Sequence, residues 1–176
     1  EGFGGEEGIR KGKGELYDYL RHHNGLAFVM WDYGYLQKMS KGIPKLITYG
    51  TQNSHITGFV QNSSGLLEVS ITGGADIVSI KTNLVGEYNL PNILLAVAIG
   101  KYFKVPDEKI KTALENYIPS NSRSQLIERD GNKIILDAYN ANPSSMKAAI
   151  DNFVNMDGTD KVLILGGMME LGSQSL

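Results

Sequence analysis

The richest set of chemically capable residues lies in the stretch IILDAYNANPSS, residues 134–145. An apolar run ends there in Asp137, and an Asn-rich turn leads on into a predicted helix. In open α/β sheets, ligands bind at the carboxyl ends of the parallel strands. A carboxylate at that edge suits a ribose diol, and the following helix N-terminus suits an anion. Ordinary turn chemistry explains the same residues equally well, because Asn and Pro are common between a strand and a helix.

A second candidate is Lys13, on a helix predicted over residues 6–23. On a helical wheel Lys13 falls within about 60° of Ile9, Leu16 and Leu20, so we expect this ammonium to face inward. A buried ammonium is costly unless it is paired or neutralised. Two interpretations stay open: the lysine snorkels with its stem over the core, or it is desolvated and reacts with carbon dioxide to give a carbamate that binds a hard cation.

The turn GEYNLPN, residues 86–92, joins a predicted strand to a predicted helix. Asn89 stands just before that helix, where an amide can cap backbone N–H groups or hold a ligand; capping is the simpler explanation. Asn92 lies on the apolar face of the helix. We therefore expect it to be a buried amide bonded to the backbone.

These residues must be positioned by an alternation of strands and helices, which hydrophobic periodicity predicts. Strands are predicted over residues 26–32, 45–50, 55–61, 66–73 and 75–84, and helices over 35–40, 91–103 and 107–117. The short polar stretch 118–122 is the best linker, so we predict one domain over 1–119 and a second over 120–176.

The second predicted domain begins with a hairpin that turns at Asp130-Gly131. A helix capped by Asn142 follows, with Pro143 in its first turn. A further apolar run over residues 161–168 is predicted to be a strand. Strand, helix and strand in this order predict a parallel α/β sheet.

Composition narrows the classes of function. Of the 176 residues, 41% are hydrophobic and 20% charged, with a formal net charge of -2, so no basic surface is available for nucleic acid or anionic lipid. The absence of cysteine rules out disulfides and thiolate zinc sites. No apolar run approaches the roughly 18 residues of a membrane span. We expect no nucleic-acid partner and no membrane partner.

Four stretches together resemble successive motifs of the Mur ligase family: GKGELYDYL, LVGEYNLPNILLAVAIG, NSRSQLIERDGNKIILDAYNANPSSMKAAIDNF and KVLILGGMMELGSQS. They follow the family's order over nearly the whole chain. The YNANP-S-M and M-ELG strings are most similar to the members that add D-alanyl-D-alanine to UDP-N-acetylmuramoyl-tripeptide. The resemblance implies an α/β chain, with part of a P-loop-type ATPase central domain followed by part of a Rossmann-like, parallel-sheet C-terminal domain.

The resemblance also implies an activity: ATP- and Mg2+-dependent amide synthesis for peptidoglycan precursors. In such ligases the γ-phosphate passes to the precursor's terminal carboxylate, and the amine of D-alanyl-D-alanine attacks the acyl phosphate. Metal ions and positive groups would offset the charge on the phosphoryl oxygens. A cytoplasmic monomer is expected. We expect the 176-residue chain alone not to turn over.

Nucleotide contacts carry over residue by residue. By the resemblance, Asn89 contacts the adenine, and Arg123 reaches the nucleotide phosphates across the domain interface. Asp137 matches the acidic residue near the ribose, with Tyr139 and Asn140 beside it.

The remaining assignments concern metal and acceptor. Lys13 matches the family's carbamylated lysine, which helps to hold Mg2+, and Asn142 and Glu170 are candidates for lining the dipeptide pocket. Tyr88 stands where many relatives have His, and Gly167 where Asp is usual.

No G-x-x-x-x-G-K-[ST] phosphate loop occurs in the chain, so the main phosphate clamp must come from elsewhere in such a ligase. Two alternatives remain open. One is a sister ligase, which adds a single amino acid or a glutamate tail to folate. The other is a nucleotide-binding module without catalysis.

Overall fold

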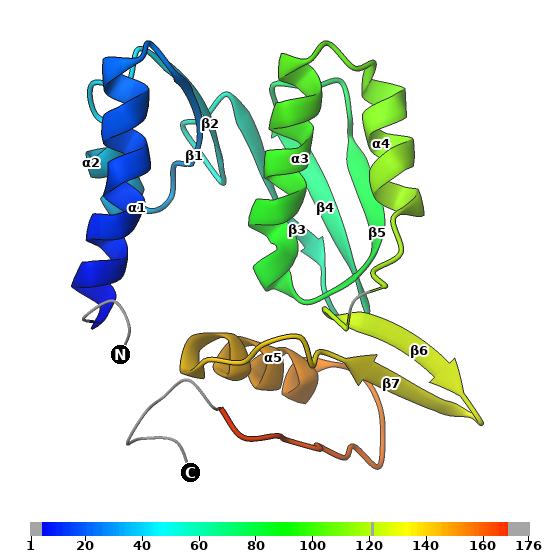
Figure 1. Cartoon of the computed structure of the whole chain (residues 1–176). Coiled ribbons are helices and arrows are strands. Elements are labelled where there is room, and N and C mark those ends of the chain that lie inside the picture. The colour runs from blue at the N-terminus through cyan, green and yellow to red at the C-terminus, as the bar shows by residue number, and fades with distance from the viewer. Residues whose placement is uncertain (1–4, 121, 169–176) are drawn as a thin grey trace.

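The computed structural model describes residues 5–120 and 122–168. Its larger part is a five-stranded mixed sheet of order β1-β2-β3-β4-β5. The strands are β1 Leu26–Met30, β2 Lys45–Gly50, β3 Ile56–Asn62, β4 Leu66–Gly73 and β5 Ser79–Val85. The pairs β1–β2 and β2–β3 are parallel, and β3–β4 and β4–β5 are antiparallel. Helices α3 (Leu90–Tyr102) and α4 (Asp107–Asn116) lie against one face of this sheet (Figure 1).

The main core lies between the sheet and α3. Leu67, Val69 and Ile80 from the sheet and Leu94 and Val97 from α3 are fully buried. Helix α3 is apolar on nearly every side, as the sequence predicted, and such a helix is stable in water only when other elements enclose it. Burial of each of these side chains stabilises the fold by about 1.5–3 kcal/mol.

Two glycines allow the elements around α3 to pack closely. A Cβ on Gly58 of β3 would lie 2.6 Å from the carbonyl oxygen of Ser70 and 2.8 Å from a methyl carbon of Leu94. A Cβ on Gly100 of α3 would lie 2.7 Å from Cδ1 of Ile110 in α4. Gly58 is required because a Cβ there would meet a backbone oxygen, whereas a Cβ on Gly100 would force the Ile110 side chain to shift.

Helices α1 (Gly5–His22) and α2 (Gly34–Ser40) form a smaller core with the N-terminal strand. Successive side chains of a strand point to opposite faces. Ala27 and Val29 of β1 accordingly pack with Tyr17 and Leu20 of α1, whereas Met30 joins the main core. Thus β1 is covered on both faces.

Most of the described side chains of α1 before Tyr17 are exposed, although Arg10 lies over the Tyr35 ring of α2. Ile9 is 45% exposed and Leu16 is 61% exposed, and Lys13 is exposed as well. The inward-facing position expected for Lys13 is therefore wrong. A helical wheel shows which residues share a side of a helix, but not whether anything covers that side; the covered part of α1 lies at Tyr17 and Leu20.

Beyond the first sheet, β6 (Gln125–Arg129) and β7 (Asn132–Leu136) form an antiparallel hairpin, followed by α5 (Pro143–Asn155). The predicted turn at Asp130-Gly131 is confirmed: both residues have positive φ, 52° and 77°, as a tight hairpin turn requires. Figure 1 shows the hairpin and α5 lying beyond the end of the sheet where α3 begins.

The expected α/β class is confirmed, but the strand predicted over residues 161–168 is not formed. In the described part of this region, the sheet consists of the antiparallel pair β6–β7, so the expected parallel pairing is not seen. Val162 is 74% exposed and Ile164 is 94% exposed. Parallel strands are stable when neighbouring strands and helices bury them on both faces. Lys161 contacts Val154 and Phe153 of α5, but no described strand pairs with residues 161–168.

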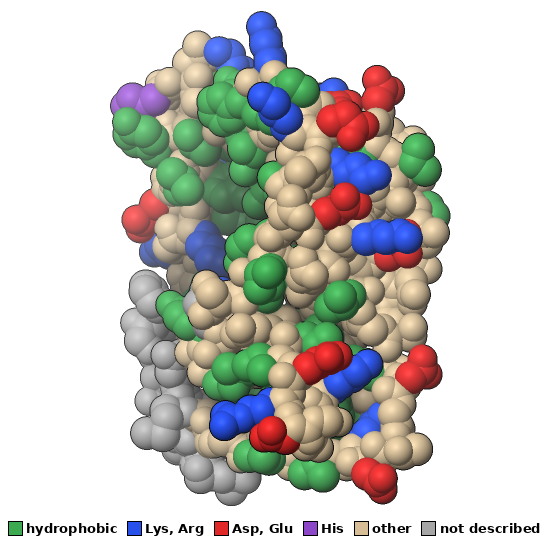
Figure 2. All heavy atoms as spheres, turned by 90° about the vertical axis from the view of Figure 1, so that its right-hand side faces the viewer, with side chains coloured by type: hydrophobic (Ala, Val, Ile, Leu, Met, Phe, Trp, Pro, Cys, Tyr) green, Lys and Arg blue, Asp and Glu red, His purple; other side chains and the backbone are tan. Residues whose placement is uncertain are grey.

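Charges are mixed over the surface. On the face in Figure 2, Lys and Arg side chains alternate with Asp and Glu, and no area of a single sign stands out. This agrees with the small net charge of -2. In the described portion of the chain, every helix is too short or too polar to cross a bilayer.

Candidate functional site

The linker segment 122–124 follows α4 and leads into β6. Ser122 and Ser124 have φ of 56° and 50°, so both residues that flank Arg123 are left-handed. Such conformations cost about 1–3 kcal/mol each and persist where the surroundings fix them. Here the N–H of Ala138 donates to the carbonyl oxygen of Ser122 over 2.8 Å, and the N–H of Ser124 donates to Oδ1 of Asp137 over 3.3 Å. The residues after β7 therefore hold the linker in shape.

A side-chain hydrogen bond joins the segment 122–124 to η1 (Glu87–Asn89), the short 3-10 helix between β5 and α3. The hydroxyl of Tyr88, in η1, lies 2.8 Å from Oγ of Ser124, and Ser124 is buried. Burial raises the pKa of Tyr88; the Ser124 hydrogen bond lowers it, and the nearby Asp137 carboxylate raises it again. The net shift is upward, so the hydroxyl keeps its proton at neutral pH and can donate.

Asn89 is held by its side chain. Its Nδ2 donates to the carbonyl oxygen of Val85 over 2.9 Å, and its Oδ1 accepts from Nδ2 of Asn92 over 3.1 Å. The expected cap is wrong: Asn89 has helical φ and ψ and makes no side-chain bond to the α3 backbone. Asn92 is exposed, not buried as expected. One amide proton and one oxygen lone pair of Asn89 remain, enough to match the donor and acceptor edge of an adenine.

Arg123 and Tyr139 are stacked. The guanidinium carbon of Arg123 lies 3.8 Å from the centroid of the Tyr139 ring, and both side chains are exposed. In the described part of the chain, no salt bridge involves Arg123. A guanidinium that lies over a ring keeps its N–H groups available, and these form a fork that matches phosphate oxygens.

The residues after β7 differ in how far their polar atoms are engaged. Asp137 is exposed, and its Oδ1 accepts from Ser124, while its other oxygen has no hydrogen-bond partner among the described residues. Oδ1 of Asn140 accepts from the N–H of Ala141 over 2.8 Å. A second carboxylate oxygen that faces solvent can accept from the hydroxyl groups of a ribose.

Asn142 caps α5, as the sequence predicted. Its Oδ1 accepts from the N–H of Ser145 over 2.9 Å, and Oγ of Ser145 accepts from the N–H of Asn142 over 3.0 Å. This reciprocal arrangement is a capping box. The side-chain amide nitrogen of Asn142 stays available for a ligand. Glu170 lies outside the described residues.

The structure thus connects some predicted residues and not others. Tyr88 and Ser124, each next in sequence to a predicted contact, link Asn89 on one side with Arg123 and Asp137 on the other. No contact joins Lys13 to this group among the described residues. Within residues 5–120 and 122–168, no cluster of three or more His, Asp or Glu side chains could hold a metal ion. Sequence reasoning missed Ser124, because its role depends on a long-range partner.

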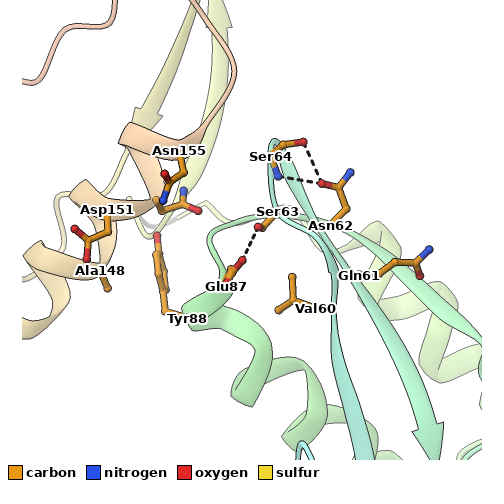
Figure 3. A pocket seen from close by; sticks show the side chains of 11 residues that line it. Val60, Gln61, Asn62, Ser63, Ser64, Glu87, Tyr88, Ala148, Asp151 and Asn155 are labelled. Atoms are coloured by element: carbon orange, nitrogen blue, oxygen red, sulfur yellow. Dashed lines mark hydrogen bonds between the residues drawn. The ribbon is translucent and has the colours of Figure 1, made fainter.

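A cavity of about 540 Å3 opens beside Tyr88. Ser63 and Glu87 line it on the side of the first sheet, and Ala148, Asp151 and Asn155 of α5 line the other side (Figure 3). The hydroxyl of Ser63 donates to Glu87 over 2.7 Å. None of the described residues that line the cavity is basic. Beside Tyr88, this polar cavity separates the first sheet from α5.

The chain is mixed α/β, and polar side chains of η1 and of the segment 122–124 meet at the hydrogen bond between Tyr88 and Ser124. Residues 1–100 match the family model of the Mur ligase middle domain, and residues 122–175 match that of the Mur ligase glutamate ligase domain. The chain belongs to the Mur ligase family.

Individual relatives are more specific. The chain is 34% identical over 171 residues to the UDP-N-acetylmuramoyl-tripeptide--D-alanyl-D-alanine ligase of Bacillus subtilis, covering 96% of this chain and 37% of that protein. It is 32% identical to the Escherichia coli ligase of the same name, over 99% of this chain and 40% of that protein. A crystal structure of MurF from Acinetobacter baumannii superposes with a TM-score of 0.80 and 26% identity, covering 97% of this chain and 37% of that one. The chain spans about two fifths of these relatives.

Proposed function

We propose that this chain is part of an ATP-dependent ligase that adds D-alanyl-D-alanine to UDP-N-acetylmuramoyl-tripeptide in the cytoplasm. Relatives that bear this name support the substrates. One structural observation carries the nucleotide site: the contacts from Tyr88 through Ser124 to Asp137, which bring residues of both parts together. We further propose that residues 1–119 belong to the central ATP-binding domain and 120–176 to the C-terminal domain, and that the full ligase is a monomer.

Each nucleotide contact has a physical rationale. Asn89 retains a donor and an acceptor for the adenine edge, and the outward oxygen of Asp137 accepts from ribose hydroxyl groups. Arg123 presents its fork to the phosphates, with Tyr139 and Asn140 beside it. ATP supplies the phosphoryl group that turns a carboxylate, a poor electrophile, into a reactive acyl donor. The chain's own contribution is to orient the nucleotide and offset its charge.

Lys13 is proposed as a carbamate that helps to hold Mg2+. Its amine is exposed, so carbon dioxide can reach it, and a carbamate would give the oxygen ligands that Mg2+ prefers. Because the described residues form no metal cluster of their own, further ligands must come from the nucleotide or from elsewhere in the ligase. Asn142 and Glu170 are proposed to line the dipeptide pocket.

The decisive experiment uses the full-length ligase that contains this chain. ADP release is measured with UDP-N-acetylmuramoyl-tripeptide and D-alanyl-D-alanine, and then with single amino acids or with folate and glutamate. We expect release to require both the tripeptide precursor and the dipeptide. Release driven by a single amino acid would assign the chain to a sister ligase, such as the D-glutamate ligase of Listeria innocua, to which it is 28% identical over 148 residues. Nucleotide binding without turnover for any amine would show a non-catalytic module.

A further inference from the structure

The function proposed above uses the contact between Tyr88 and Ser124 only as evidence that the two parts of the chain meet, and it gives the Tyr88 hydroxyl no role of its own. We propose that Tyr88 is a positioning residue: through Ser124, its hydroxyl fixes the linker that carries Arg123, and so sets where the guanidinium stands relative to Asn89. The inference rests on the proposed nucleotide site.

The first support is position in sequence. Tyr88 immediately precedes Asn89 in η1, and Ser124 immediately follows Arg123. The 2.8 Å contact between the two hydroxyl groups therefore joins the neighbours of two nucleotide candidates that lie on different sides of the boundary. A shift at this contact moves both candidates relative to each other, because each is next in sequence to a residue that forms the bond.

The second support is that the tyrosine ring is itself fixed. Gly86 has φ of 92°, and a Cβ there would lie 2.3 Å from Cε1 of Tyr88. The ring packs directly on the backbone of Gly86, in a space that a side chain would fill. Contact with this backbone limits the movement of the ring, and so of its hydroxyl, on the side of Gly86.

The third support is that the hydrogen bonds of the segment 122–124 go to two different parts of the chain. Ala138 and Asp137, both beyond β7, bind Ser122 and Ser124 and keep the left-handed turn in place. The third contact, from Ser124 to Tyr88, is instead made to η1, which follows β5. Beside it lies the cavity of about 540 Å3, so that side offers open space rather than packing. Loss of the hydroxyl should leave the linker's shape intact and release its tie to η1.

The test compares Tyr88→Phe, Ser124→Ala and the double variant in the full-length ligase. Each single change should raise the KM for ATP about three- to tenfold, the loss expected for one neutral hydrogen bond. The KM for D-alanyl-D-alanine should stay unchanged. A loss of folded enzyme would lower the maximal rate and would raise neither KM. The double variant should be no worse than either single, because all three remove the same interaction. Tyr117→Phe, which removes a hydroxyl from an exposed tyrosine before the linker, is the matched control.

Two results would overturn the inference: an unchanged KM for ATP in Tyr88→Phe, or single effects that multiply in the double variant. Both are distinct from failure of the proposed function. If the wild-type ligase shows no ATP dependence with any amine, the nucleotide site itself is wrong. An ATP-dependent wild type with an unaffected Tyr88→Phe variant rejects the positioning role alone.

Discussion

At the scale of single residues, the stack of Arg123 on Tyr139 places a cation without tying up its donors. In a salt bridge, some N–H groups of a guanidinium donate to the carboxylate. A ring that packs on the face of the guanidinium leaves these N–H groups available. A lysine could keep the charge, but it has neither the flat face nor the fork. Geometry as well as charge is therefore expected to matter at this position.

Arg123→Lys should raise the KM of the full ligase for ATP about tenfold, because a point charge replaces a two-pronged donor. The KM for ATP is measured from initial rates over a range of ATP concentrations. Arg129→Lys is the control: Arg129 ends β6, the strand that follows Arg123, its side chain is 79% exposed, and its ion pair is with the neighbouring Asp130. Equal KM values for Arg123→Lys and the wild type would contradict the phosphate role of Arg123.

Residue-level prediction succeeded where a local rule decided the outcome. The Asn142 cap follows from residue types a few positions apart, and it formed as expected. Lys13 and Asn92 were placed by helical wheels, and both are exposed. A wheel gives the direction of a side chain relative to its own helix, while burial depends on which other element packs there. The nucleotide roles of Asn89 and Asp137 stay predictions.

At the scale of elements, α3 and α4 are joined by an ion pair. Nζ of Lys101 lies 2.6 Å from Oδ1 of Asp107, and Oδ2 of Asp107 accepts from the N–H of Asp76 over 2.6 Å. The Lys101 hydrogen bond, followed by that of the Asp76 backbone, lowers the pKa of Asp107 below its ordinary value of 3.8. One carboxylate thus holds the start of α4 to α3 and to the segment before β5.

Asp107→Asn should reduce the free energy of unfolding by about 1–2 kcal/mol at neutral pH, as loss of a charge-assisted hydrogen bond does. Because the folded-state pKa is lowered, the wild-type contribution is complete above the ordinary value of 3.8 and is lost as the pH falls through the folded pKa. Urea unfolding at neutral pH and in acid measures the loss of unfolding free energy and its dependence on pH. Asp130→Asn, at a side chain 87% exposed, is the control. A gap between Asp107→Asn and wild type that did not narrow in acid would contradict this assignment.

Elements defined by their own pattern were predicted well, and those that need partners were not. The hairpin β6–β7 was found from Asp130-Gly131, since the turn itself sets the pairing. The strand over residues 161–168 was expected from apolar residues alone. An apolar run becomes a strand when a neighbouring strand supplies hydrogen bonds. The residues of the run do not show whether such a neighbour exists.

At the scale of the whole molecule, the run 162–165 exposes apolar side chains, and its backbone pairs with no strand among the described residues. Such a segment is a template for pairing with another chain. We expect the mean mass of the isolated 176-residue chain to rise with concentration in sedimentation velocity. Ile164→Lys, at the most exposed of these side chains, should reduce that rise. Thr159→Lys adds the same charge in a polar part of the segment, and equal behaviour of the two variants would point to net charge instead.

The fully buried side chains gather in β4, β5 and α3, where Leu67, Ile80 and Leu94 lie, while the first turns of α1 and the run after α5 contribute exposed apolar residues. Cooperative opening of a segment requires the loss of the contacts that bury it. The chain should therefore not melt uniformly. Its two outer regions can open at small cost on their own, whereas the antiparallel strands and α3 can open only with the molecule as a whole.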